Sequence, residues 1–190
     1  MDLGRLLARG VIGGYFVGHG AQKLFGSFGG PGIEGATGMM TALQMRPARR
    51  NAYAAGVTET AGGALLVLGL ATPAAAAALI GVMATAIRTV HLPNGAWNAN
   101  GGLEYNAVLI ATLTALAEDG PGDISLDGLL GFERPGAAWG LGALALGVAA
   151  STATIELGRR APLDDAATEA AGAAQADDVV DTAGDPVTES

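Results

Sequence analysis

Five stretches of the chain are apolar and long enough to form helices that cross a lipid bilayer, and this feature limits the fold most. Crossing the hydrocarbon layer of about 30 Å takes roughly 20 residues in a helix. The stretches cover residues 3–25, 49–70, 73–92, 103–117 and 136–155. The fourth is short, whereas the fifth contains no ionisable residue. We therefore predict an all-α protein, a transmembrane helical bundle of four or five helices.

The composition agrees with lipid as the solvent of these stretches. Hydrophobic residues make up 50% of the chain and charged residues 15%, whereas soluble domains contain about 25% charged residues. The chain has no cysteine, which excludes disulfides, iron–sulfur clusters, Cys-ligated zinc and thiol nucleophiles. The sequence also lacks a phosphate-binding loop and a zinc-protease motif. We expect no metal site and no intrinsic cofactor, so a redox role would need a mobile cofactor such as a quinone.

Acidic residues concentrate in the C-terminal tail. Residues 1–160 hold ten basic and ten acidic residues, whereas residues 161–190 hold eight acidic residues and no basic one, which gives the net charge of −8. The tail has no aromatic residue, and such a composition cannot bury enough surface to fold. We predict a bundle over residues 1–127, an additional transmembrane helix within 128–160 and a disordered acidic tail over 161–190. No basic patch indicates nucleic-acid binding.

The positions of lysine and arginine predict an orientation in the cell membrane. If all five stretches cross, the residues on one side are Arg5, Arg9 and Arg134, and those on the other are Lys23, Arg46, Arg49, Arg50, Arg88, Arg159 and Arg160. The more positive side is usually cytoplasmic, so we expect a multi-pass protein with a cytoplasmic tail. With four crossings the tail would lie on the side of the N-terminus. The first stretch lacks a signal-peptidase site and is expected to remain as a helix.

Small residues recur at every fourth position in two of the stretches. Gly10, Gly14 and Gly18 share one face of the first, and Ala54, Thr58 and Gly62 share one face of the second. Such stripes allow helices to pack closely in a membrane. We expect them at helix contacts, and they are consistent with a homo-oligomer. The glycine-rich connection over residues 26–48 ends in MMTALQM, which predicts a short helix at the membrane surface.

Most ionisable side chains within the apolar stretches fall toward the cytoplasmic half of the predicted bilayer, and the exceptions are Glu59 and Arg9. Inserting such a side chain costs about 2.5–3.5 kcal/mol, so it usually marks a site or a buried pair. Glu59 lies near the middle of the second stretch and Glu104 at the start of the fourth, and we interpret both as catalytic proton carriers. The other polar residues at this level would bind a quinone or another anionic oxygen: His19, Lys23, Arg88, His91 and Tyr105.

A structural role is the alternative for these residues. The ends of Lys23, Arg88, His91 and Glu104 could reach the membrane surface, with Glu59 held in an ion pair for packing. Arg9 lies toward the opposite end, where we expect it to reach water. Two histidines, His19 and His91, are the minimum for binding a haem iron. No further motif supports haem, and we do not expect it.

Five sequence blocks follow one another over residues 5–127. They are RGVIGGYFVGHGAQKL (9–24), FGGPGIEGATG (28–38), TETAGG with LGLAT (58–63 and 68–72), NGGLEYN (100–106) and GPGDISLD (120–127). Together they resemble the DoxX family of small membrane proteins. The resemblance implies a four-helix membrane bundle and membrane redox chemistry, because some members are subunits of thiosulfate:quinone oxidoreductase or of quinol-oxidising systems. Other members associate with detoxifying enzymes that act under sulfur and oxygen stress. The fifth stretch and the tail depart from the family pattern.

Two functions agree with these features. The first is an integral membrane subunit of a quinone-linked redox or oxidative-stress detoxification complex, in which a redox partner protein supplies the electrons. The second is a non-catalytic scaffold that recruits soluble enzymes to the lipid bilayer, for example through the acidic tail. A transporter would need two related halves, and the sequence shows no convincing internal repeat. Whether the chain acts as an oxidoreductase subunit stays open at this point.

Overall fold

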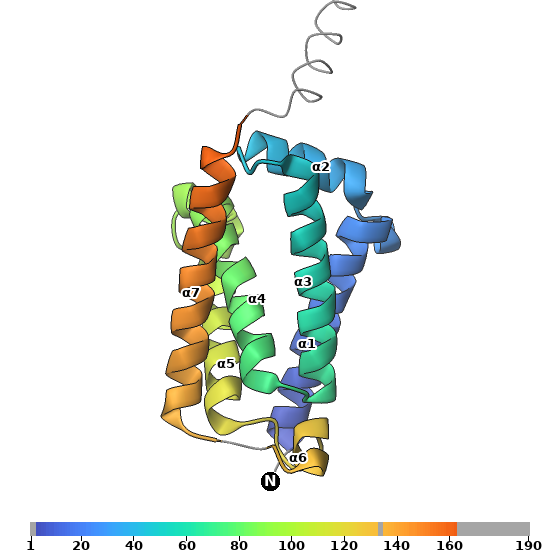
Figure 1. Cartoon of the computed structure of the whole chain (residues 1–190), viewed down its shortest axis with the longest axis vertical. Coiled ribbons are helices and arrows are strands. Elements are labelled where there is room, and N and C mark those ends of the chain that lie inside the picture. The colour runs from blue at the N-terminus through green and yellow to red at the C-terminus, as the bar shows by residue number, and fades with distance from the viewer. Residues whose placement is uncertain (1–2, 133–134, 163–190) are drawn as a thin grey trace, which may run out of the picture.

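The computed structural model describes residues 3–132 and 135–162, which form helices joined by short turns (Figure 1). The long helices are α1 (Leu3–Phe25), α3 (Ala48–Leu68), α4 (Thr72–Ala86), α5 (Glu104–Asp119) and α7 (Ala137–Arg160). The shorter elements are α2 (Gly32–Ala42), α6 (Leu126–Leu130), the π-helical segment η2 (Ile87–His91) that continues α4, and the 3₁₀ turns η1 (Ser27–Gly29), η3 (Leu92–Asn94) and η4 (Asn98–Asn100). No strand occurs in these two ranges, so the predicted all-α class is confirmed.

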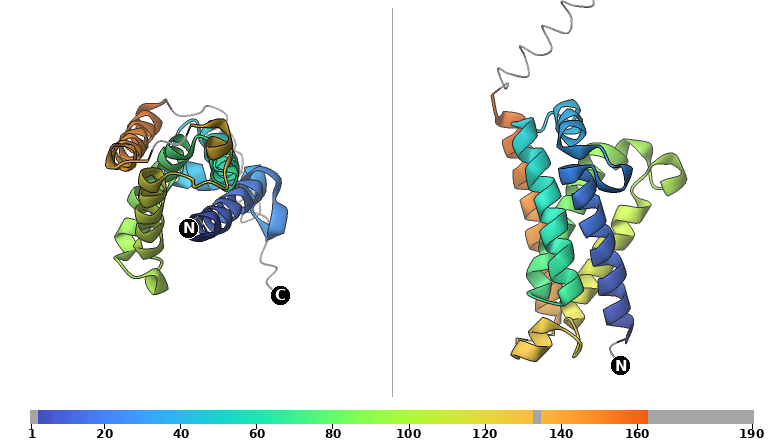
Figure 2. Two further views of the ribbon diagram at one scale, coloured as in Figure 1. Left: turned by 90° about the horizontal axis from the view of Figure 1, so that it is seen from below. Right: turned by 90° about the vertical axis from the view of Figure 1, so that its right-hand side faces the viewer.

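The long helices alternate in direction, as short connections between neighbouring helices require. The helix α2 lies across the end of the bundle where α3 begins and α7 ends, and α6 lies at the opposite end, near the N-terminus (Figures 1 and 2). The helix α7 packs against α4 and α5, whereas α3 packs against α1, α2 and α4. The predicted helix over 3–25 is confirmed, and the other four stretches match α3, α4 with η2, α5 and α7 to within five residues at each end.

Three predictions fare differently. The short surface helix begins earlier than the MMTALQM segment suggested, since α2 covers Gly32–Ala42. Arg134 and residues 163–190 lie outside the described residues, and with them the predicted tail. The division of the chain at residue 127 stays a prediction, although α7 packs directly on the helices that precede it.

The helices α1 and α3 cross with their backbones in contact, which only glycine permits here. A Cβ atom on Gly13 would lie 2.6 Å from the carbonyl oxygen of Gly63, and a Cβ atom on Gly63 would lie 2.6 Å from that of Gly13. Farther along, a Cβ atom on Gly20 would lie 2.6 Å from the carbonyl oxygen of Gly56. Gly13, Gly20 and Gly63 therefore set the distance between α1 and α3, because a Cβ atom on each would meet backbone of the other helix.

The glycine stripe predicted for the first helix does not form this contact. A Cβ atom on Gly10, Gly14 or Gly18 would meet nothing within 4 Å, so this stripe forms no helix contact among the residues that the structure describes. The stripe predicted for the second helix is used in part, because a Cβ atom on Gly62 would lie 2.9 Å from Leu79 of α4. The homo-oligomer stays a prediction.

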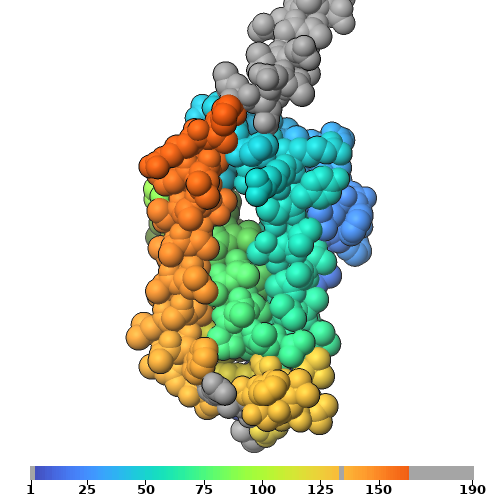
Figure 3. Space-filling model, in the orientation of Figure 1, coloured from blue at the N-terminus to red at the C-terminus, as the bar shows by residue number. Residues whose placement is uncertain are grey.

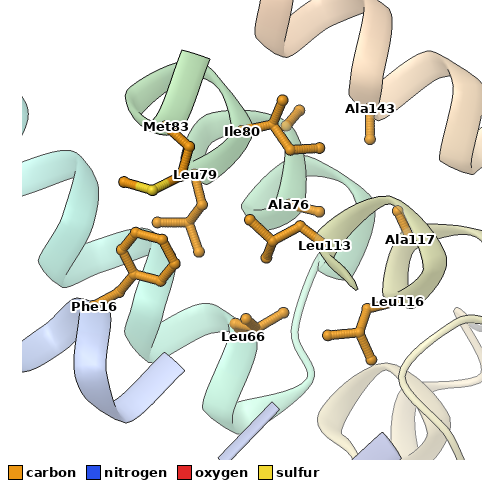
Figure 4. Close-up of a cluster of buried hydrophobic side chains, with 11 residues drawn as sticks. Phe16, Leu66, Ala76, Leu79, Ile80, Met83, Leu113, Leu116, Ala117 and Ala143 are labelled. Atoms are coloured by element: carbon orange, nitrogen blue, oxygen red, sulfur yellow. The ribbon is translucent and has the colours of Figure 1, made fainter. Parts of the chain in front are cut away.

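The apolar core fills the half of the bundle nearest α6. Figure 4 shows Phe16 of α1, Leu66 of α3, Leu79 of α4 and Leu113 of α5 within one buried cluster. The helix α7 joins this core closely, because a Cβ atom on Gly147 would lie 2.8 Å from the carbonyl oxygen of Ala77. Leu66 and Leu113 occupy the halves of their helices that point toward α6, so the core leaves the half nearest α2 less filled.

The outward faces of the long helices are apolar. Large apolar side chains at least 56% exposed form a stripe along α1: Leu3, Leu7, Val11 and Tyr15. Leu141 and Leu146 on α7 are 65% and 63% exposed. Two helical segments, Thr72–Asn94 and Ala137–Arg160, are long and apolar enough to cross a membrane by length and composition. Contiguous apolar surface of this kind is rare on soluble monomers and is typical of contact with lipid or partners.

Arg9 is buried at the α6 end of the bundle, so the prediction that it reaches water is wrong. Its side chain is 1% exposed. The guanidinium donates hydrogen bonds to the carbonyl oxygens of Pro121, Ile124 (2.8 Å) and Val67 (3.5 Å). Backbone carbonyls thus accept from both terminal nitrogens of a buried cation that the sequence places in an apolar helix, and they fix the loop after α5 to α1. The buried Nε of Arg9 has no hydrogen-bond partner among the residues that the structure describes.

Asp127 fastens the same loop to the start of α4. Its carboxylate accepts hydrogen bonds from the backbone N–H groups of Ala71 (2.9 Å) and Thr72 (3.1 Å), and its own N–H donates to the carbonyl oxygen of Gly69 at 2.9 Å. An acidic acceptor at a helix N-terminus satisfies N–H groups that the helix leaves free. The GPGDISLD block therefore has a structural role at this end.

Candidate functional site

A cavity of about 740 Å³ lies between α1, α3, α4, α5 and α7, with α2 covering its end. Its volume falls within the range of about 300–1,000 Å³ that small-molecule sites have. Figure 3 shows an opening between α7 and α3 in the half of the molecule nearest α2. The lining is mostly apolar and includes Ile12, Phe16, Val82 and Leu109. Because most of the wall is apolar, its few polar side chains determine which polar groups a ligand could place there.

Lys23 and Glu59 form an ion pair on this wall. The Lys23 ammonium donates a hydrogen bond to Glu59 Oε2 at 2.6 Å, and the two side chains are 18% and 5% exposed. The close crossing of α1 and α3 produces this geometry, because Gly20 and Gly56 each lie three residues before one partner. Taking two charges out of water is costly, so a pair held between two membrane-type helices indicates either a site or a specific packing contact.

The second polar side of the cavity is formed by His19, His91 and Tyr105 from α1, η2 and α5. His91 Nδ1 donates to the carbonyl oxygen of Gly101 at 2.8 Å, and His19 Nδ1 lies 3.1 Å from the side-chain oxygen of Gln22. Figure 2 shows α5 diverging from α1 toward the α2 end. The structure thus places five of the seven predicted site residues on one cavity.

Glu104 and Arg88 lie outside the lining of this cavity. Glu104 is exposed, and its Oε2 accepts a hydrogen bond from the backbone N–H of Asn98 at 3.0 Å, within the loop before α5. Arg88 is exposed and donates to Thr152 Oγ1 of α7 at 2.9 Å. The structure therefore does not bring Glu104 to the wall that carries Glu59, and Arg88 lies where the alternative surface role predicts it.

Asn106 is a wall residue that sequence reasoning missed. It is 6% exposed, and its amide N–H donates to the sulfur of Met83 at 3.4 Å. Within the part of the chain that the structure describes, this is the one hydrogen bond assigned to the side chain, and a thioether is a weak acceptor. A buried amide usually has stronger partners. Asn106 can therefore donate to or accept from a molecule in the cavity.

Methionines cover the cavity toward the α2 end. The sequence has five methionines, and those after the first, Met39, Met40, Met45 and Met83, all line the cavity. Methionine is unbranched and polarizable, so it adapts to ligands of irregular shape. The only sequence signal for these cavity-lining methionines was the MMTALQM segment, which suggested a surface helix.

The helical bundle, the apolar outward faces and the two segments suited to cross a bilayer define an integral membrane protein built of helices. The DoxX family model matches residues 4–92, so this part of the chain is similar to the DoxX family, a family of membrane helical proteins. The matched segment contains Lys23, Glu59 and His91 and ends before α5 and α7. A search of curated proteins and a search of solved structures each found no match.

Proposed function

We propose that the protein is the membrane subunit of a quinone-linked redox complex and that its cavity binds the quinone headgroup beside Lys23 and Glu59. One observation carries this proposal, the 2.6 Å ion pair on the wall of a mostly apolar cavity. A quinone has the matching chemistry, because its ring and tail are apolar while its two carbonyl oxygens accept hydrogen bonds and protons.

Reduction of a quinone consumes two electrons and two protons and gives a quinol. In the proposed site the Lys23 ammonium donates a hydrogen bond to one carbonyl oxygen and stabilises the negative charge that forms there as electrons arrive. Glu59 relays one proton to that oxygen, and the second carbonyl oxygen receives the other proton from the polar side formed by His19, His91 and Tyr105. Asn106 can donate to a ligand oxygen from α5. A redox partner protein supplies the electrons, because the chain has no cysteine to hold an iron–sulfur cluster.

The orientation of the proposed site follows from the basic residues. Four basic residues lie near helix termini at or toward the α2 end of the bundle. Lys23 lies near the end of α1, Arg49 near the start of α3, Arg88 just after α4 and Arg160 at the end of α7. With the long helices crossing the membrane, this end is cytoplasmic by the positive-inside rule. His19, His91 and Tyr105 then form a polar side through which cytoplasmic protons reach Glu59.

Quinone binding to Glu59→Gln tests the proposal. The protein is purified in mild detergent and titrated with ubiquinone and menaquinone analogues, with affinity measured by equilibrium binding. We expect Glu59→Gln to weaken binding by about tenfold or more, which corresponds to about 1.4 kcal/mol. The matched control is Glu34→Gln, which removes an ion pair of similar length, 2.7 Å to Arg49, whose side chains are exposed. Absence of binding by the wild-type protein, or equal binding by the two variants, contradicts the proposal.

The scaffold function remains the second candidate, on the basis of the acidic residues 161–190. Deleting that segment separates the two functions. A scaffold that uses the tail loses its co-purifying partners, whereas quinone affinity at Lys23 and Glu59 is unchanged.

A further inference from the structure

The opening between α3 and α7 is edged by small residues. The helix α3 contributes Ala54, Ala55 and Thr58 to this part of the lining, and α7 contributes Ala150, Ser151 and Thr154. The strip of α4 between them is also small, with Ala78, Gly81 and Thr85. The opening seen in Figure 3 lies between these two edges. We call this opening the α3–α7 window.

The α3–α7 window lies at the depth of the acyl chains, just beneath the headgroups. Ala54 lies six residues after the start of α3, and Thr154 lies six residues before the end of α7, so each edge is about 9 Å from the α2 end of its helix. The 24 residues of α7 span about 36 Å, some 6 Å more than the hydrocarbon layer. A centred helix therefore places Thr154 about 6 Å inside that layer.

The surroundings of the window suit lipid and not water. Val57 on α3 is 53% exposed, and Leu146 and Leu157 on α7 are 63% and 70% exposed. The polar atoms at the edge bond to one another, because the Thr85 hydroxyl lies 3.0 Å from that of Ser151 and 2.8 Å from the carbonyl oxygen of Gly81. The window therefore presents hydrocarbon to the bilayer, and two of its hydroxyls, those of Thr85 and Ser151, are hydrogen-bonded within the protein.

The other sides of the cavity are less suited to an apolar ligand. Toward the α2 end, the cavity is lined by Met39, Met40 and Leu43, whose side chains are larger than those at the window. Toward α5, the lining carries His19, His91 and Tyr105, which suit water and protons. The α3–α7 window, with its small residues, therefore suits the entry of a bulky amphiphile better than these two sides.

We infer that the cavity takes up its ligand sideways from the bilayer, through the α3–α7 window, and that the ligand is a long-tailed amphiphile whose hydrocarbon tail stays in this window. The headgroup part of this inference rests on the proposed function, since it places a quinone ring beside Lys23 and Glu59. The sideways route itself depends only on the window, its depth and its small residues.

A photoactivatable lipid tests the route. The full-length protein is reconstituted in phosphatidylcholine vesicles that contain a phosphatidylcholine with a diazirine in its acyl chain, and labelled peptides are identified by mass spectrometry after illumination. Met83 is 9% exposed and lines the cavity, so it reports on acyl chains inside, whereas Leu146 is 63% exposed and reports on the outer surface. The measured quantity is the label at Met83 relative to that at Leu146.

Tryptophan substitutions close the window in this experiment. Ala54→Trp and Ala150→Trp place a large side chain at exposed positions on its edges, so the folded core is not overpacked. The matched controls are Ala61→Trp and Ala149→Trp, which are exposed on the same helices but do not line the cavity. We expect the relative label at Met83 to be lost in the two window variants and retained in both controls.

Two results overturn the inference: no acyl-chain label at Met83 in the wild-type protein, or a label that Ala54→Trp and Ala150→Trp leave unchanged. Competition with a long-chain quinone distinguishes this failure from that of the proposed function. A window-dependent label that excess quinone does not displace refutes the quinone and leaves the sideways route. Quinone binding together with a window-independent label refutes the route and leaves the quinone.

Discussion

The crossing of α1 and α3 gives the most quantitative prediction, the effect of Gly63→Ala. The added Cβ atom would lie 2.6 Å from the carbonyl oxygen of Gly13 and 2.9 Å from Cβ of Phe16. Ordinary van der Waals contact begins at 3.4 Å, so the two backbones must separate by 3.4 − 2.6 = 0.8 Å. Because the obstacle is backbone, a rotamer change cannot relieve it. Overpacking of this kind costs about 1–3 kcal/mol.

Gly14→Ala is the control that isolates this steric cost. Gly14 lies in the same crossing region of α1, but a Cβ atom there meets nothing within 4 Å. Both variants gain the helix propensity of alanine, about 1 kcal/mol in water, so this gain cancels when they are compared. We expect Gly63→Ala to have a free energy of unfolding about 1–3 kcal/mol below that of Gly14→Ala.

Reversible unfolding in mixed detergent and dodecyl sulfate micelles, followed by circular dichroism, measures this difference. Quinone affinity provides a second readout, because separating α1 from α3 also lengthens the 2.6 Å contact between Lys23 and Glu59. Equal stabilities of the two variants, within about 0.5 kcal/mol, would refute the assignment of this glycine contact as the determinant of helix spacing.

Three further predictions concern individual side chains. Glu59→Gln lowers the free energy of unfolding by about 3 kcal/mol because it leaves Lys23 without its partner. Adding Lys23→Met recovers most of that loss. A double-mutant cycle measures both effects, and no recovery would contradict the pairing. Asp127→Ala lowers the melting temperature, since removing the acceptor at the start of α4 costs about 1–2 kcal/mol, and an unchanged melting curve would count against that role. Asn106→Leu changes stability by less than about 1 kcal/mol, because only a weak bond to sulfur is lost, yet it weakens quinone binding several-fold in the equilibrium assay; unaltered affinity would remove Asn106 from the site.

The sequence predicts the helices well because length and apolar composition determine them directly. The ion pair is also within reach of sequence reasoning. Lys23 near the end of one helix and Glu59 near the middle of the next meet once the helices are antiparallel, and the structure brings them to 2.6 Å. Hydropathy and alternation of direction are enough for this step.

Three features lie beyond such reasoning, each for a physical reason. Gly14 and Gly13 are neighbours on α1, and only the position of α3 decides which of them packs. The sequence predicts Glu104 in one site with Glu59, but in the loop before α5 its carboxylate accepts a hydrogen bond from Asn98 N–H. From the sequence, Arg9 is expected to reach water near the end of α1, but the loop after α5 packs on it and accepts its hydrogen bonds. In each case the deciding partner is a distant segment, which local patterns do not specify.

The buried Arg9 has a consequence for biosynthesis. Its guanidinium bonds to the carbonyl oxygens of Pro121 and Ile124, which follow it by 112 and 115 residues. Synthesis proceeds from the N-terminus at about 5–20 residues per second, so the ribosome delivers these partners seconds after α1 has emerged. During that interval the nascent first helix holds a cation without its acceptors, and the insertion machinery or lipid headgroups must accommodate it. The contacts of α1 are thus completed only after a further 115 residues have been synthesised.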